Sequence, residues 1–122
     1  MTTIPDTGML PVLYKREIIL LLSSNIKRME ADGNNTRITL ADGTKIFNTK
    51  TLKYYSEKLN GKGFYRIHDK HLINLSYFKA MDKGRGGHIT LTCGERLATS
   101  YRCKLRFRKT LKILNGLNDI RT

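Results

Sequence analysis

The sequence lacks the long apolar run that a membrane span requires. A span needs about 20 consecutive apolar residues, whereas the longest aliphatic run, residues 18–22, follows the charged pair Arg16 and Glu17 and stops at Ser23. We therefore expect residues 18–22 to form a buried strand. The N-terminal region also lacks the basic start, apolar stretch and small-residue cleavage site of a secretory signal, so the cytoplasm is the expected location.

Cysteine is scarce as well. Only Cys93 and Cys103 occur, and without a secretory signal they are expected to be reduced thiols that pack rather than a disulfide framework. His68 and His71 are three residues apart, but no set of Cys, His or carboxylates at ligand spacing completes a metal site. Paired carboxylates, a Gly-rich phosphate loop with a lysine, and a nucleophile with a nearby base are also missing. The sequence predicts no cofactor and no enzyme.

Acidic residues are few. The chain has 10 Asp and Glu against 23 Lys and Arg, which gives a formal net charge of +13. The excess is uneven, because residues 62–112 contain 13 basic and 3 acidic residues. Clustered Lys and Arg displace counterions from a phosphate backbone, so a nucleic acid is the first candidate partner. An anionic membrane surface is the second candidate, and solubility alone is the third explanation.

The length of 122 residues suits a single domain. Both prolines, Pro5 and Pro11, lie near the N-terminus together with Gly8, and hydrophobic periodicity is weak there. Residues 1–15 are therefore predicted to be a leader or linker. The domain itself is expected over residues 16–116, with residues 117–122 as a C-terminal tail.

Short apolar runs alternate with turn signals at close spacing, which indicates mainly antiparallel β-structure. Polar and apolar residues alternate over residues 36–40, and Asp42 and Gly43 then predict a hairpin turn onto residues 45–47. A second hairpin is expected around Gly94. The other expected strands are residues 26–30, 64–67, 72–81, 89–91 and 96–98, with connections at residues 31–35 and 82–87.

Two helices are predicted. The first covers residues 51–59 and ends at Asn60 and Gly61, a sequence that favours a left-handed stop. The second begins after Ser100, a residue type that caps helix N-termini. The apolar residues at helical spacing are Leu52, Tyr55 and Leu59 in the first helix, and Cys103, Phe107, Leu111 and Leu114 in the second.

Residues 64–68 read Phe-Tyr-Arg-Ile-His, and residues 72–74 read Leu-Ile-Asn. These segments resemble the Phe-x-Arg-x-His and aliphatic-aliphatic-Asn signature of the LytTR DNA-binding domain of bacterial transcriptional regulators. Residues 100–102 (Ser-Tyr-Arg) are similar to its Ser-x-Arg near the C-terminus. The resemblance runs from about residue 18 to residue 114 and includes the Gly-Asn-Asn-Thr loop.

The resemblance implies a mainly β fold with short helices, built as an elongated stack of small antiparallel β-sheets with a short C-terminal helix. Domains of this family read successive major grooves of a bent duplex with loops. The implied function is a sequence-specific double-stranded DNA-binding domain of a bacterial transcriptional regulator. The implied partners are DNA with paired repeat sites and a receiver domain or a second copy of the chain, without a small-molecule substrate.

Three places carry over from the family by position, and their residue types suit DNA. Asn can make a bidentate contact to adenine and Arg to guanine, while Lys and Thr contact phosphates or base edges. The candidate DNA-binding residues are Asn34, Asn35, Thr36 and Arg37 in the first loop, His68, Asp69 and Lys70 in a turn, and Arg102 with Lys104 near the last helix.

Other interpretations of these residues remain open. Asn35 can be a turn residue only, and His68 and Arg66 can be structural. Asp69 departs from the family, which usually has Arg, Lys or Asn and then Ser after the histidine. Its carboxylate could accept from cytosine N4 or cap the turn, and we favour the cap. The remaining basic residues of the last helix, expected at most near phosphates, are Arg106, Arg108, Lys109 and Lys112.

Two other functions also remain open. Basic β-rich domains often bind RNA through exposed aromatic side chains, but the six tyrosines lack the spacing of a stacking motif. A protein-interaction or membrane-surface module that uses charge alone is the other alternative. The family resemblance favours duplex DNA over both.

Overall fold

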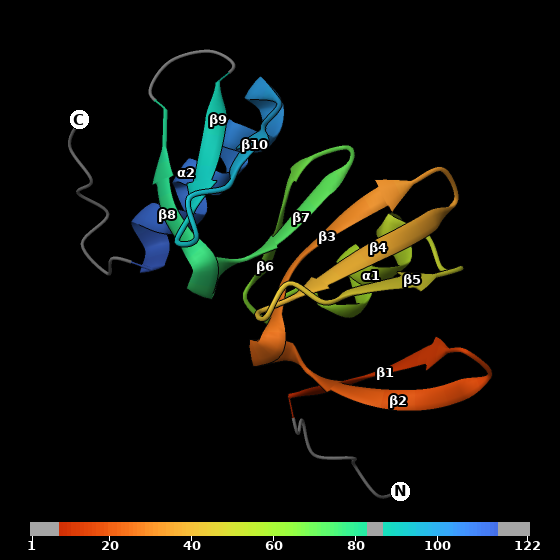
Figure 1. Ribbon diagram of the computed structural model, residues 1–122. Coiled ribbons are helices and arrows are strands. Elements are labelled where there is room, and N and C mark those ends of the chain that lie inside the picture. The colour runs from red at the N-terminus through yellow and green to blue at the C-terminus, as the bar shows by residue number, and fades with distance from the viewer. Residues whose placement is uncertain (1–7, 83–86, 115–122) are drawn as a thin grey trace, which may run out of the picture.

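Three antiparallel β-sheets follow one another through the molecule (Figure 1). In the computed structural model, which describes residues 8–82 and 87–114, β1 (Met9–Tyr14) and β2 (Glu17–Leu22) form a two-stranded sheet at one end. A five-stranded sheet in the order β5-β4-β3-β7-β6 occupies the middle, and a three-stranded sheet in the order β10-β9-β8 lies beyond it. The predicted stack of small antiparallel sheets is confirmed.

The remaining elements are short. Two 3₁₀ turns, η1 (Ser23–Asn25) and η2 (Leu75–Tyr77), connect one sheet to the next. The elements are β3 (Ile26–Asp32), β4 (Asn35–Leu40), β5 (Lys45–Asn48), α1 (Leu52–Lys58), β6 (Phe64–His68), β7 (His71–Asn74), β8 (Phe78–Met81), β9 (His88–Leu91), β10 (Arg96–Ala98) and α2 (Tyr101–Leu114).

Local capping and turn chemistry confirms the predicted helices and the first hairpin. Asp42 Oδ1 accepts from the Thr44 N–H at 2.9 Å in the β4–β5 turn. Thr51 Oγ1 accepts from the third N–H of α1, at 3.1 Å, and Ser100 Oγ accepts from the Cys103 N–H at 3.2 Å at the start of α2. These short-range bonds depend on adjacent residues, which explains why the sequence predicts them well.

The region predicted to be a leader contains a strand. Residues 9–14 form β1, which pairs along its length with β2 and buries Leu10 and Val12 at 3% and 2% exposure. The connection is a two-residue turn in which Lys15 and Arg16 both have positive φ, 51° and 68°. That turn type normally carries Asn-Gly, so neither the turn residues nor Pro11 indicated a hairpin. Residues 1–7 lie outside the described part of the chain.

A second prediction is wrong in detail. Residues 72–81 were expected to be one strand, but η2 divides them into β7 in the middle sheet and β8 in the third sheet. Asn74 makes the break, because its Oδ1 accepts from the Ser76 N–H at 3.0 Å and its Nδ2 donates to the Ile26 carbonyl at 2.9 Å. Residues 83–86 of the predicted connection and the predicted tail lie outside the described residues.

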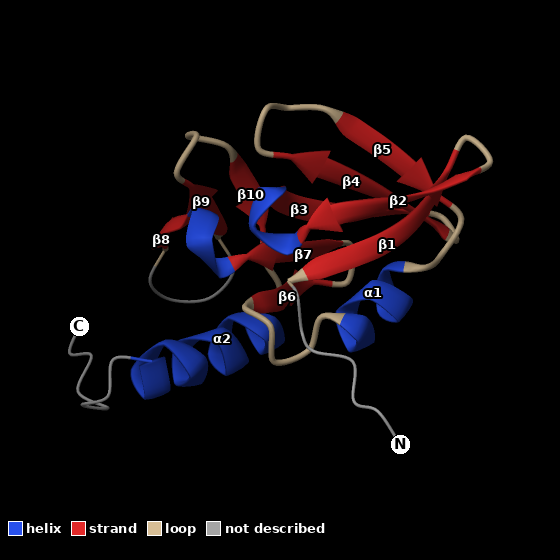
Figure 2. Ribbon diagram, turned by 90° about the horizontal axis from the view of Figure 1, so that it is seen from below, coloured by secondary structure: helices blue, strands red, loops and turns tan. Residues whose placement is uncertain are grey.

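The hydrophobic residues form two cores, one on each face of the middle sheet. On β7, Leu72 belongs to the core shared with the β1–β2 sheet and α1, and Ile73 belongs to the core shared with the third sheet and Phe107 of α2. α1 contacts β3, β6 and β7, and α2 contacts β6; both helices lie at the lower border of the view in Figure 2. No helix within residues 8–82 and 87–114 is long and apolar enough to cross a membrane.

β2 and Cys93 are less buried than the sequence predicts. Ile18 and Leu20 of β2 are 75% and 62% exposed. In this strand only Leu21 is buried in the core. Both cysteines are free thiols, and Cys103 is buried as expected. Cys93 lies exposed in the β9–β10 turn rather than in a core, with its Sγ 3.8 Å from Lys27 Nζ.

Candidate nucleic-acid interface

Hydrogen bonds join the three segments in which DNA-binding residues were predicted. The Lys70 carbonyl in the β6–β7 turn accepts from the Ala31 N–H near the end of β3, at 2.9 Å. The Ile67 carbonyl of β6 accepts from the Ser100 N–H at 3.1 Å and from Thr99 Oγ1 at 2.7 Å. We call the β3–β4 turn, the β6–β7 turn and the first turn of α2 the loop edge, which follows the upper border of the fold in Figure 1.

The β3–β4 turn exposes two amides. β3 and β4 are joined by only Gly33 and Asn34, with Asp32 opposite Asn35 in the pairing. Gly33 has φ +62° at the first central position, where a tight hairpin turn favours glycine. Asn34 and Asn35 are both exposed, so their side chains are accessible to a ligand from solvent.

The two residues that follow are less accessible. Thr36 is fully buried, and its Oγ1 donates to the Lys50 carbonyl at 2.8 Å, so the side chain does not fit the predicted DNA contact. Arg37 forms ion pairs with Glu30 at 3.3 Å and Asp32 at 3.6 Å and stacks on an exposed phenylalanine of β5. Its guanidinium is therefore largely engaged within the protein.

The β6–β7 turn is held by the residues of the sequence signature. Arg66 Nε donates to the His68 carbonyl at 3.1 Å, and Arg66 Nη2 donates to the Asp69 carbonyl. His68 Nδ1 accepts from the Lys70 N–H at 3.1 Å. The turn is capped by His68 and not, as predicted, by Asp69. Asp69 and Lys70 are left exposed at its tip.

The first turn of α2 exposes a cation. Arg102, expected just before the helix, lies within its first turn and is exposed. This turn contains no acidic residue, and a cation near a helix N-terminus costs roughly 0.3 to 1 kcal/mol. An anion bound here would offset that cost, because the free N–H groups of a helix start also attract negative charge.

Lys104 contradicts its prediction as a DNA-binding residue. It is only 1% exposed, on the side of α2 that also buries Cys103 and Phe107. Its ammonium therefore does not reach a duplex in this conformation. Arg106 and Lys109 are exposed and Arg108 is half-buried, which agrees with basic residues spread round the helix. The side chain of Lys112 lies outside what the structure describes.

Tyr101 is exposed beside Arg102 and was not among the predicted DNA-binding residues. It is 41% exposed and directly precedes Arg102 in the first turn of α2. An exposed aromatic ring beside an arginine suits contact with a base or sugar. In the sequence, the position of this tyrosine in the middle of Ser-Tyr-Arg could have indicated such a contact.

Behind the loop edge, a buried arginine links the middle sheet to the third sheet. Arg28 of β3 donates through Nε and Nη2 to both carboxylate oxygens of Glu95, at 3.0 and 2.8 Å, and through Nη1 to Glu30 at 3.1 Å. Burial by itself would raise the pKa of the Glu30 carboxyl, but the hydrogen bond and charge of Arg28 hold that pKa below its usual value. The network fixes the position of β3, which leads into the loop edge.

His71 lies beside this network and makes stability depend on pH. It pairs with Glu30 across the sheet, and within the described residues its buried Nδ1 has no hydrogen-bond partner. Burial lowers the pKa of His71, and the charges of Arg28 and His68 add to the effect, although Glu30 and Glu95 oppose it. The imidazole of His71 therefore binds a proton more readily in the unfolded chain than in the folded chain.

The free energy of unfolding is expected to fall as the pH drops below about 6.5, the ordinary histidine pKa. Urea unfolding at pH 7.5 and pH 5.5 measures the fall, and H71Q should reduce it. Equal pH dependence in H71Q and the wild type would contradict the assignment.

Comparisons with known proteins agree with this fold. A family model described as the LytTr DNA-binding domain matches residues 16–112. Among solved structures, the LytTr DNA-binding domain of a response regulator from Bacillus cereus is 20% identical, with a TM-score of 0.72 over 86% of this chain and 97% of that chain. No curated protein matches the sequence. Because the family model covers most of its length, the chain belongs to the LytTr DNA-binding domain family.

Proposed function

We propose that this DNA-binding domain reads specific sequences in duplex DNA through the loop edge, as part of a bacterial transcriptional regulator. One observation carries the proposal. The hydrogen bonds from the Ala31 N–H to the Lys70 carbonyl and from the Ser100 N–H to the Ile67 carbonyl hold three separate segments together. Each segment exposes at least one polar side chain suited to DNA. These side chains are those of Asn34, Asn35, Lys70 and Arg102.

The exposed groups divide into base-reading and phosphate-binding types. The amides of Asn34 and Asn35 match the N6 and N7 atoms of adenine, and the guanidinium of Arg102 matches O6 and N7 of guanine. Lys70 suits a phosphate, which positions the protein without reading sequence. The hydrogen bonds between the three segments keep these groups at fixed positions relative to one another, as base reading requires.

Asp69 gains a role in this proposal because His68 already caps the turn. Its exposed carboxylate can accept a hydrogen bond from cytosine N4, whereas near a phosphate it would be repelled. We assign Asp69 to selection for cytosine at the base facing the β6–β7 turn.

The same proposal covers partners and location. The domain acts in the cytoplasm on paired repeat sites, beside a receiver domain in a longer regulator, and it uses neither a cofactor nor a small-molecule substrate. It catalyses no reaction. The supporting observations are the family membership and the placement of exposed cations beside the loop edge. Footprinting on duplexes with one site and with two sites at varied spacing tests the paired arrangement.

R102A is expected to weaken binding to the cognate duplex by roughly 1 to 3 kcal/mol and to relax the preference at one base pair. The reason is the loss of a bidentate contact to guanine. Fluorescence anisotropy with the cognate duplex and with variants at each position measures both effects.

R16A is the matched control, because it removes the same charge from the tip of the β1–β2 hairpin, outside the three segments of the loop edge. It should retain the base preference. If R102A weakened cognate and random duplexes equally, Arg102 would be a phosphate contact and its assigned role in base reading would be wrong.

A further inference from the structure

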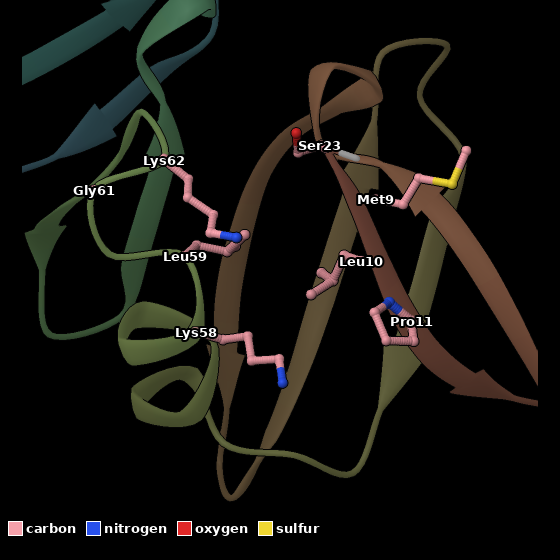
Figure 3. Close-up of a pocket in the computed structure, with 9 residues that line it drawn as sticks. Met9, Leu10, Pro11, Ser23, Lys58, Leu59, Gly61 and Lys62 are labelled. Carbon is pink, nitrogen blue, oxygen red and sulfur yellow. The ribbon is translucent and has the colours of Figure 1, made fainter. Parts of the chain in front are cut away.

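The β1–β2 hairpin is apolar on both of its faces. Leu10, Val12 and Leu21 point inward and are buried in the core. Figure 3 shows this alternation at the start of β1, where Leu10 points toward Leu59 and Met9 points away from it. We call the other side the outward hairpin face, which consists of Met9, Pro11 and Leu13 on β1 and Ile18, Leu20 and Leu22 on β2.

The outward hairpin face is well exposed. Its side chains are at least 46% exposed at the five large aliphatic positions, with Ile18 highest at 75%. A strand with one face in solvent normally alternates apolar and polar residues, whereas a continuous apolar run is typical of a strand covered on both sides. The composition of β1 and β2 therefore fits a second layer packed on this face.

We propose that this second layer is another copy of the chain, so that two outward hairpin faces pack against each other in a two-fold symmetric dimer. The residues of the face form three directly opposed pairs, Met9–Leu22, Pro11–Leu20 and Leu13–Ile18. The symmetry axis passes near the central pair. The Met9–Leu22 end of one face therefore packs against the Leu13–Ile18 end of the other face. A patch that is apolar throughout is self-complementary in this arrangement.

The area fits a modest but specific interface. The five aliphatic side chains expose on the order of 500 Å² in each copy, which reaches the size of the largest patches on monomeric proteins. Two such faces bury on the order of 1,000 Å² together, near the lower limit for a biological contact. We therefore expect a dimer with a dissociation constant in the micromolar range.

The outward hairpin face avoids the charge repulsion between two copies. Two chains of formal charge +13 repel each other, so they associate best where neither presents a cation. None of the six outward residues is charged. Lys15, Arg16 and Glu17 lie at the hairpin tip, and Lys50, Lys58 and Lys62 line pockets beside Met9, Pro11 and Leu13. An antiparallel arrangement places the two tips at opposite ends of the interface and separates their charges.

The proposed dimer leaves DNA binding free. The β1–β2 hairpin lies below the middle sheet in Figure 1, and the loop edge lies along the upper border. Both copies therefore keep an exposed loop edge. The dimer extends the proposed function by giving one assembly two DNA-reading edges, but its test is independent of DNA.

Sedimentation velocity of the wild-type chain over about 1 to 500 μM tests the proposal. We expect a reversible monomer–dimer equilibrium that I18K/L20K abolishes, with at least a tenfold rise in the dissociation constant. L105K, which changes a leucine of α2 that is 41% exposed, is the control and should still dimerise. Far-UV circular dichroism verifies that the variants fold.

A cross-link provides a second test that does not depend on weakening the fold. L20C in a C93S background removes the exposed native thiol and places one near the symmetry axis. Mild oxidation should give a covalent dimer, and E57C on α1 in the same background should not. A wild-type chain that stays monomeric throughout the range, or equal cross-linking of the two variants, would overturn the proposal and leave the face to a different partner.

Discussion

The affinity of the chain for its DNA site is expected to fall by roughly a thousandfold between about 50 and 200 mM salt, if about six phosphates are contacted. Each phosphate neutralised by Lys or Arg releases condensed counterions, and added salt opposes that release. Lys70, Arg102, Arg106 and Lys109 are exposed on or after the loop edge and supply part of this charge.

Anisotropy titrations at several salt concentrations measure the slope of log affinity against log salt. K70A should reduce the magnitude of that slope by about 1, as expected for one lost phosphate contact. K53A, an exposed change on α1, should leave it unchanged. An affinity that is flat with salt would contradict a polyanion partner altogether.

R28A is expected to lower the free energy of unfolding by about 3 kcal/mol, because it leaves Glu30 and Glu95 without their shared cation in a partly buried site. Glu95 belongs to the turn of the third sheet, and Arg28 belongs to the middle sheet. The variant should therefore loosen the connection between the two sheets and lower the melting temperature by about 10 °C.

Thermal and urea unfolding measure this loss. R28K keeps the charge but not the bidentate geometry, so it should fall between R28A and the wild type. E95Q removes the charge of the other partner in this ion pair. In the double variant R28A/E95Q, the loss in the free energy of unfolding should be smaller than the sum of the two single losses. If R28A unfolded at the wild-type temperature, the network would contribute nothing to stability.

The parts of the fold that were predicted correctly depend on neighbouring residues. The β4–β5 hairpin follows from Asp42 and Gly43, and the starts of α1 and α2 follow from Thr51 and Ser100. In each case a side chain within three residues satisfies the backbone group that defines the boundary. Such signals are visible in a single sequence.

The parts that were missed depend on distant residues. β1 is a strand because β2 and the core cover it, although its turn residues Lys15 and Arg16 are unusual for a tight hairpin. Thr36 is buried, and its hydroxyl donates a hydrogen bond to the backbone carbonyl of Lys50, which lies far along the chain. Lys104 is buried because α2 packs that side onto the third sheet and β6. Position in the sequence alone does not distinguish these residues from their exposed neighbours.

The family signature turns out to describe the scaffold of the candidate site more than its contact surface. Phe64 is a core residue, Arg66 and His68 hold the β6–β7 turn, and Asn74 anchors the connection between sheets. The residues left free to contact DNA, such as Lys70, lie between the signature positions.

Selection of binding sites from a random duplex pool tests the central claim most directly, because it requires both duplex binding and base reading by the loop edge. We predict an enriched motif with a guanine whose enrichment disappears in R102A and persists in R16A. Recovery of no motif, or single-stranded RNA of the same length competing as well as the selected duplex, would contradict sequence-specific recognition of duplex DNA.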